Sequence, residues 1–103
     1  MNSFDQVNNW LAAGKQIGRS FSFERQGFVY WSSVGVQKWR DGYKVYIDEI
    51  LESKMDAEEY EKELVVELQN IEDIDEFIKN NSLTSLANLT PCKGQKIFNP
   101  DFN

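Results

Sequence analysis

The chain has 103 residues, a net charge of −6, no histidine and a single cysteine. This length corresponds to a single domain, residues 1–103, and the 41% of apolar residues predicts that it folds unaided. The lack of histidine excludes Ser-His-Asp and Cys-His catalysis and histidine metal sites, and a lone Cys92 excludes an internal disulfide.

The first predicted element is an amphipathic helix that begins at Ser3. Ser3 and Gln6 have the spacing of a capping box, in which side chains satisfy the free amides of the first turn. Gly14 and Gly18 bracket its end. An apolar stripe at helical spacing identifies the buried side as Phe4, Val7, Trp10 and Leu11.

From Arg19 onward the apolar residues alternate with polar ones, which predicts strands. Phe21 and Phe23 belong to the first strand, and a turn at 25–27 precedes a second strand rich in aromatic and β-branched residues.

Asp41-Gly42 lies between two further strand-like runs and predicts a two-residue hairpin turn. Pairing outward from that turn sets Arg40 opposite Tyr43. The inward face of the hairpin is then formed by Val34, Val36, Val45 and Ile47.

The segment after the hairpin changes from a polar stretch to an apolar one. Residues 52–62 are too polar for a core element and predict a surface loop or a short helical turn. Residues 63–68 are predicted to form a strand because of the Val65-Val66 pair. A helix stays open as the alternative, since helical spacing also relates Tyr60, Leu64, Leu68 and Ile71.

A second helix is predicted from Asn70, a good N-cap, with Glu72 and Asp73 at the positive end of the helix dipole. Its apolar stripe is formed by Ile71, Ile74, Phe77 and Ile78. The remaining tail contains both prolines and is expected to be irregular, covering the core with Leu86, Leu89, Ile97 and Phe98.

These elements predict an α+β fold: an N-terminal helix, an antiparallel sheet of three or four strands, a C-terminal helix and an irregular tail. Antiparallel sheets can leave one face in contact with water.

Acidic residues are concentrated in a segment that we call the carboxylate belt, Asp48 to Glu76. It holds thirteen acids and two lysines, a local charge of −11, between flanks of +3 and +2. Such a belt can be a solvated surface, but its segregation and nearby tyrosines favour a partner-binding surface. The candidate contact residues are Tyr43, Asp48, Glu49, Glu52, Asp56, Glu58, Glu59, Tyr60, Glu61 and Glu63.

A negative surface attracts basic proteins and repels nucleic acid and anionic membranes. The acid spacing does not reproduce the calcium-binding loop, and Gly14 to Gly18 lacks the length and the Lys-Ser/Thr of a phosphate-binding loop. We therefore predict no metal, no cofactor and no catalytic residue. Cys92, with no histidine or second cysteine, is assigned no role.

Two other functions remain as hypotheses. Trp39 stands beside the predicted turn among Lys38, Arg40 and Lys44, so an adaptor binding through this hairpin, or through a sheet edge, is the first. A small enzyme using paired carboxylates is the second, but no pocket motif supports it.

The N-terminal residues are too polar for a secretory signal, and no apolar run approaches the roughly 20 residues of a membrane span, so we expect a cytoplasmic protein. In size, helix-strands-helix plan, carboxylate belt and the tail LTPCKGQKIFNP at 89–100, the chain resembles the small immunity proteins of bacterial contact-dependent inhibition and other polymorphic-toxin systems. The resemblance implies a basic toxin, a nuclease above all, as partner. It also implies that the carboxylates mimic a polyanionic substrate and cover the toxin's catalytic cleft.

Overall fold

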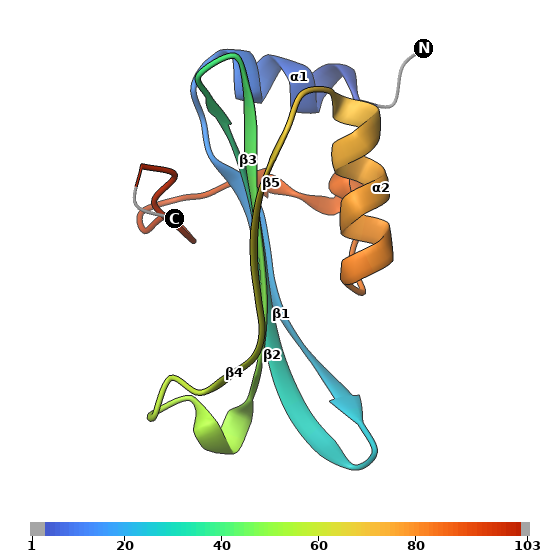
Figure 1. The fold of residues 1–103 in the computed structure, drawn as a ribbon, viewed down its shortest axis with the longest axis vertical. Helices are drawn as coiled ribbons and strands as arrows, with labels where there is room; N and C mark the ends of the chain where they lie inside the picture. The colour runs from blue at the N-terminus through green and yellow to red at the C-terminus, as the bar shows by residue number, and fades with distance from the viewer. Residues whose placement is uncertain (1–3, 102–103) are drawn as a thin grey trace.

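The fold is α+β, as predicted, and the computed structural model describes residues 4–101 (Figure 1). The antiparallel sheet has five strands instead of the predicted three or four, in the order β4-β3-β2-β1-β5, because residues 90–91 of the tail pair with the edge of β1. The elements in chain order are α1 (Asp5–Ala12), β1 (Ile17–Arg25), β2 (Phe28–Trp39), β3 (Gly42–Leu51), the 3-10 turn η1 (Glu52–Lys54), β4 (Tyr60–Leu68), α2 (Ile71–Asn81), the 3-10 turn η2 (Leu86–Asn88) and β5 (Thr90–Pro91).

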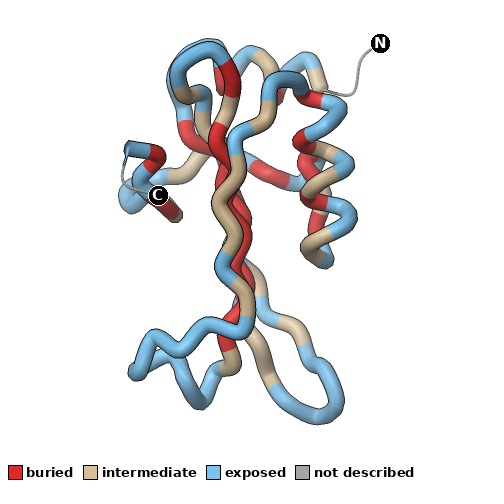
Figure 2. Tube along the Cα trace, in the orientation of Figure 1, coloured by how far each residue is buried: buried red, intermediate tan, exposed pale blue. Residues whose placement is uncertain are grey.

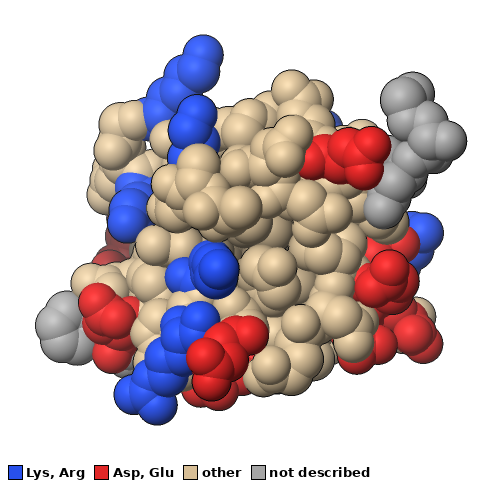
Figure 3. Space-filling view, turned by 90° about the horizontal axis from the view of Figure 1, so that it is seen from above, with Lys and Arg blue, Asp and Glu red and all other residues tan. Residues whose placement is uncertain are grey.

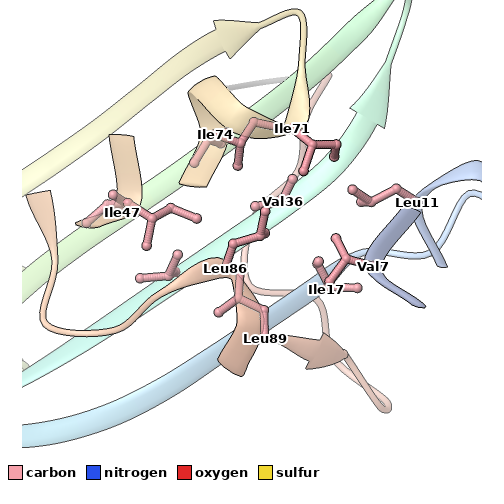
Figure 4. Packing of buried hydrophobic residues seen from close by; sticks show 12 residues of the cluster. Val7, Leu11, Ile17, Val36, Ile47, Ile71, Ile74, Leu86 and Leu89 are labelled. Carbon is pink, nitrogen blue, oxygen red and sulfur yellow. The ribbon is translucent and has the colours of Figure 1, made fainter. Parts of the chain in front are cut away.

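Both helices pack on one face of the sheet, which we call the helix face. The predicted inward residues of β2 and β3 are fully buried there, and they meet Val7 and Leu11 of α1 and Ile74 of α2 (Figure 4). Leu86 and Leu89 of the tail complete this core, as predicted.

The helix boundaries follow local capping chemistry. Asn70 caps α2 as predicted, because its Oδ1 accepts a hydrogen bond of 2.9 Å from the backbone N–H of Asp73. α1 begins after Phe4, which makes no side-chain capping bond, and the predicted cap residue Ser3 lies outside the described residues. Gly14, at φ 82°, turns the chain from α1 toward the sheet.

The β2-β3 hairpin has a different register from the predicted one. Its loop residues are Arg40 and Asp41, so that Trp39 pairs with Gly42. A Cβ on Gly42 would lie 2.7 Å from the carbonyl oxygen of Leu68. This glycine is therefore needed for the close approach of β4 rather than for the turn. The slip is two residues, so the same side chains stay on the inward face.

Residues 60–68 form a strand, which settles the choice between strand and helix. β4 starts at Tyr60, so the loop after η1 is shorter than predicted and ends at residue 59. The pairing with β3 contains an irregularity at Glu49/Ile50. Leu64 and Val66 of β4 face the core. A helix at residues 60–68 would have left this edge of β3 without a paired strand.

The tail contributes the fifth strand and then crosses to the opposite face of the sheet, which we call the tail face. β5 pairs with Ile17 and Gly18 at the start of β1. Gly18 and Gly35 face each other across β1 and β2 and leave room for Ile97 and Phe98. The Phe98 ring stacks on Tyr46, with centroids 5.4 Å apart.

Helices and tail cover only part of the sheet. Figure 2 shows the buried residues concentrated beside the helices, while the far end of the β1-β2 hairpin and the loop after β3 are mostly exposed. This uncovered end carries the candidate site. None of the helices in residues 4–101 has both the length and the apolar character needed to cross a bilayer.

Candidate binding groove on the tail face

A groove lies on the tail face beyond the docked tail. The strands place two rows of side chains there: Ser20, Ser33 and Asp48 in one, Trp31 and Ile50 in the next. The loop after η1 closes one side. We call this hollow of about 310 Å³ the acidic groove, and it is lined by Ser20, Trp31, Ser33, Asp48, Ile50, Met55, Glu58 and Tyr60.

The groove has a small polar floor and large apolar walls. The Ser20 and Ser33 hydroxyls are hydrogen bonded at 2.9 Å, and these short side chains leave the hollow open. Trp31, Met55 and Tyr60 are three of the most exposed large apolar residues, at 37%, 43% and 43%. Exposed aromatic groups gathered around a concave surface are typical of interface anchors.

A hydrogen bond and an unusual backbone conformation mark the two walls of the groove. The Trp31 indole Nε1 donates a hydrogen bond of 3.1 Å to the Glu52 carboxylate, which fixes the ring plane. Glu58 has a φ of 53°, a left-handed conformation that is uncommon for a residue with a side chain.

Asp48 is the buried acid of the groove. Its Oδ1 accepts a hydrogen bond of 2.9 Å from the backbone N–H of Ser33, and its Oδ2 lies 2.9 Å from the Tyr46 hydroxyl. Burial raises the pKa of the Asp48 carboxyl, although these two hydrogen bonds act in the opposite direction. Burial and the neighbouring carboxylates also raise the pKa of Tyr46, so its phenol stays neutral.

The electrostatic character of the groove is negative and uncompensated. Its lining contains two carboxylates and no lysine or arginine. The pKa of Tyr60 is raised by burial and by the nearby charges of Asp48, Glu63 and Glu58. A cationic side chain entering here meets negative charge from several sides.

The structure divides the predicted contact residues among three environments. Asp48, Glu58 and Tyr60 line the groove, and Glu63 lies beside Asp48 on the neighbouring strand. Glu49 and Tyr43 point to the helix face, Tyr43 against the core. The remaining predicted acids are exposed around the groove on the loop and the start of β4: Glu52, Asp56, Glu59 and Glu61.

Glu49 is neutralised inside the protein. Its side chain is 5% exposed and lies 3.4 Å from Arg25 Nη1 and 3.7 Å from Lys62 Nζ. Adjacent strand residues point to opposite faces, so Asp48 and Glu49 cannot share one surface.

The acids of α2 form a separate group. Glu72 and Asp73 in its first turn are exposed, and they lie far from the groove along the sheet. Figure 3, viewed from the end of the molecule opposite the groove, shows Lys and Arg mainly in the left half, with acids both at the right edge and at the lower left.

Sequence reasoning missed the apolar half of the site. Trp31, Ile50 and Met55 line the groove, but none was among the predicted contacts. An exposed tryptophan on a strand beside Ser32-Ser33, and a methionine in a loop of acids, were the available signals. Only the strand register shows that they meet.

Trp39 and Cys92 both lie outside the acidic groove. Trp39 already makes intramolecular contacts: its Nε1 donates to Asp101 at 3.2 Å, and Arg40 Cζ and Lys44 Nζ lie 4.1 and 4.2 Å from the centroid of its ring. Cys92 is half-buried, and burial raises the pKa of its thiol, which reduces its reactivity at neutral pH.

Within residues 4–101, no cluster of three or more acidic or cysteine side chains has a geometry suited to a metal ion. Comparison with known proteins finds no matching family model, no matching curated protein and no matching solved structure.

Replacing Asp48 with asparagine is expected to stabilise the protein by about 1 kcal/mol at pH 7. The amide Oδ1 keeps the Ser33 hydrogen bond, and Nδ2 can donate to the Tyr46 oxygen, which frees the phenol proton for Glu63. Because the folded pKa of Asp48 is raised, protonation favours the folded state. The advantage of asparagine should therefore disappear as the pH falls below the ordinary Asp range. Urea unfolding at several pH values measures both effects.

The matched control is Glu49→Gln, the same change one residue further along β3. Glu49 has two cationic partners, so its loss of charge should instead destabilise the protein by about 1–2 kcal/mol. A loss of stability in Asp48→Asn at pH 7 would contradict our account of the groove.

Proposed function

We propose that this chain is a cytoplasmic, non-enzymatic binding protein whose acidic groove takes a cationic segment of a basic protein. In this proposal it acts as an immunity protein that covers the active site of a cognate toxin, with a nuclease as the favoured target. The observation that carries the proposal is the meeting of exposed Trp31, Met55 and Tyr60 with Asp48 and Glu58 around one hollow whose lining includes no lysine or arginine.

This combination suits the side chains of lysine and arginine. The aliphatic stem of either residue can pack on Trp31 and Met55, while its charged end faces the carboxylates and the aromatic rings. The exposed acids of the surrounding loop would then raise the rate of association with a basic partner.

The alternative, an adaptor, has one observation in its favour. β5 pairs with Ile17 and Gly18 but not with the rest of β1, so residues 19–25 form a sheet edge without a neighbouring strand among the described residues. The Trp39 route has less support, because the indole is already engaged within the protein.

The proposal is tested by selecting displayed random dodecapeptides on the purified protein and sequencing the bound pool. We expect enrichment of Lys and Arg, since only a cation complements the groove. Ser20→Arg places a cation at the groove floor and should abolish binding of the selected peptides. Asn9→Arg adds the same charge on exposed α1 and should preserve binding.

Selected peptides without an excess of Lys and Arg would reject the acidic groove as the binding surface. So would peptides that bind Ser20→Arg as tightly as the original protein.

A further inference from the structure

The Tyr46 hydroxyl lies between two carboxylates. It is 2.9 Å from Asp48 Oδ2 on its own strand and 2.9 Å from Glu63 Oε2 on β4. Asp48 and Glu63 face each other across the β3-β4 pair. A phenol has one proton, so it can donate to only one of the two oxygens at a time.

A second proton is therefore needed to make both contacts favourable. With both carboxyls ionised, one carboxylate oxygen would face the phenol oxygen at 2.9 Å with no hydrogen between them. If one carboxyl is protonated, it can donate to the phenol oxygen while the phenol donates to the other. Paired carboxyls that share a site hold a proton more tightly than isolated ones.

The charged groups around Asp48 and Glu63 do not stabilise both carboxyls in their ionised form. Glu58 and Tyr60 face it from the loop and from β4, and Glu49 lies on the other side of the sheet with its own cations. Lys44 lies two residues before Tyr46 on β3 and points to the same tail face, but its Nζ donates to the Pro100 carbonyl at 2.7 Å. Glu67 of β4 is the residue opposite Lys44. From the tail, Phe98 covers Tyr46 with an uncharged ring.

We infer that Tyr46, Asp48 and Glu63 hold one exchangeable proton in the free protein, and that a cationic side chain of the partner displaces it from the groove. The proton passes to the buffer, and the two carboxylates then share the phenol proton and the incoming cation. This inference rests on the proposed function. It makes binding dependent on pH, with affinity rising by up to about tenfold per pH unit where the pair is protonated.

The first experiment uses the free protein and follows the side-chain carboxyl carbons of Asp48 and Glu63 by NMR during a pH titration. We expect the pair to take up its first proton clearly above the ordinary carboxyl range of about 3.9–4.3. In Glu63→Gln that uptake should shift back toward this range, whereas Glu72→Gln on α2 should leave it unchanged. Ordinary titration of both carboxyls in the original protein would overturn the inference.

The second experiment titrates an octalysine peptide into the protein by calorimetry, in buffers of different ionisation enthalpy. Near the midpoint of the first protonation, we expect release of about half a proton on binding, rising toward one proton at lower pH, and none for Glu63→Gln. Binding without proton release would overturn the inference that the cation displaces the shared proton, and it would leave the proposed function unaffected. No binding to the original protein would overturn both.

Discussion

Replacing Trp31 with alanine is expected to weaken binding of the selected cationic peptides about 30-fold, which corresponds to about 2 kcal/mol. Trp31 has the largest side chain of the groove lining, and its loss removes both the apolar contact for a lysine or arginine stem and the ring face for its charge. Because the side chain is 37% exposed, the fold should survive the change. Dissociation constants measured by fluorescence anisotropy of labelled peptides test this.

Trp39→Ala is the matched control, because it removes the same side chain from the same strand. Trp39 stands at the far end of β2 and contacts Asp101, Lys44 and Arg40. Its loss should leave peptide affinity within about twofold, the size of a neutral contact outside a hot spot. The reverse result, with Trp39→Ala abolishing binding and Trp31→Ala binding normally, would favour the adaptor hypothesis. Circular dichroism of both variants establishes that each is folded.

Replacing Gln16 with alanine is expected to release the tail from the sheet and to lower the free energy of unfolding by about 2–3 kcal/mol. Gln16 is buried, and its amide joins β1 to the tail: Nε2 donates to the Phe98 carbonyl at 2.8 Å, and Oε1 accepts from the Ile97 amide at 2.8 Å. Without this side chain, buried backbone groups of the tail lose their partners.

Limited proteolysis with trypsin measures the release directly. Lys93 and Lys96 are exposed, but cleavage requires the chain around them to leave the sheet, so their cutting should accelerate at least about tenfold in Gln16→Ala. The control is Gln37→Ala, which removes only the single bond that Gln16 Nε2 donates to Gln37 Oε1. The free energy of unfolding of that variant should fall by less than about 1 kcal/mol. Equal cleavage of Gln16→Ala and the original protein would show that the tail is held by other contacts.

The helices and the inward faces of the strands were predictable because they depend on local chemistry. Asn70 caps one amide in the first turn of α2 wherever that helix packs, and the alternation of Val34 and Val36 with Gly35 determines which side of β2 is apolar. The predicted register of the β2-β3 hairpin was wrong by two residues, but a shift of two leaves the same side chains on the inward face.

The fifth strand and the docking of the tail were not predictable in the same way. Thr90 and Pro91 form a strand only because β1 offers a free edge, and Phe98 lies on the tail face only because Gly18 and Gly35 leave space there. Each contact joins segments that are distant in the chain, and no local pattern records which glycine faces which ring.

The carboxylate belt shows the same division for the site. Sequence by itself determined the sign and the place of the charge, thirteen acids within residues 48–76, because composition needs no fold. Only the tertiary structure decided what that charge does. Because adjacent strand residues point to opposite faces, Glu49 pairs with Arg25 and Lys62 while Asp48 faces the groove. The register of strands β1 to β4 and the loop after η1 bring Trp31, Met55 and Tyr60 together around Asp48.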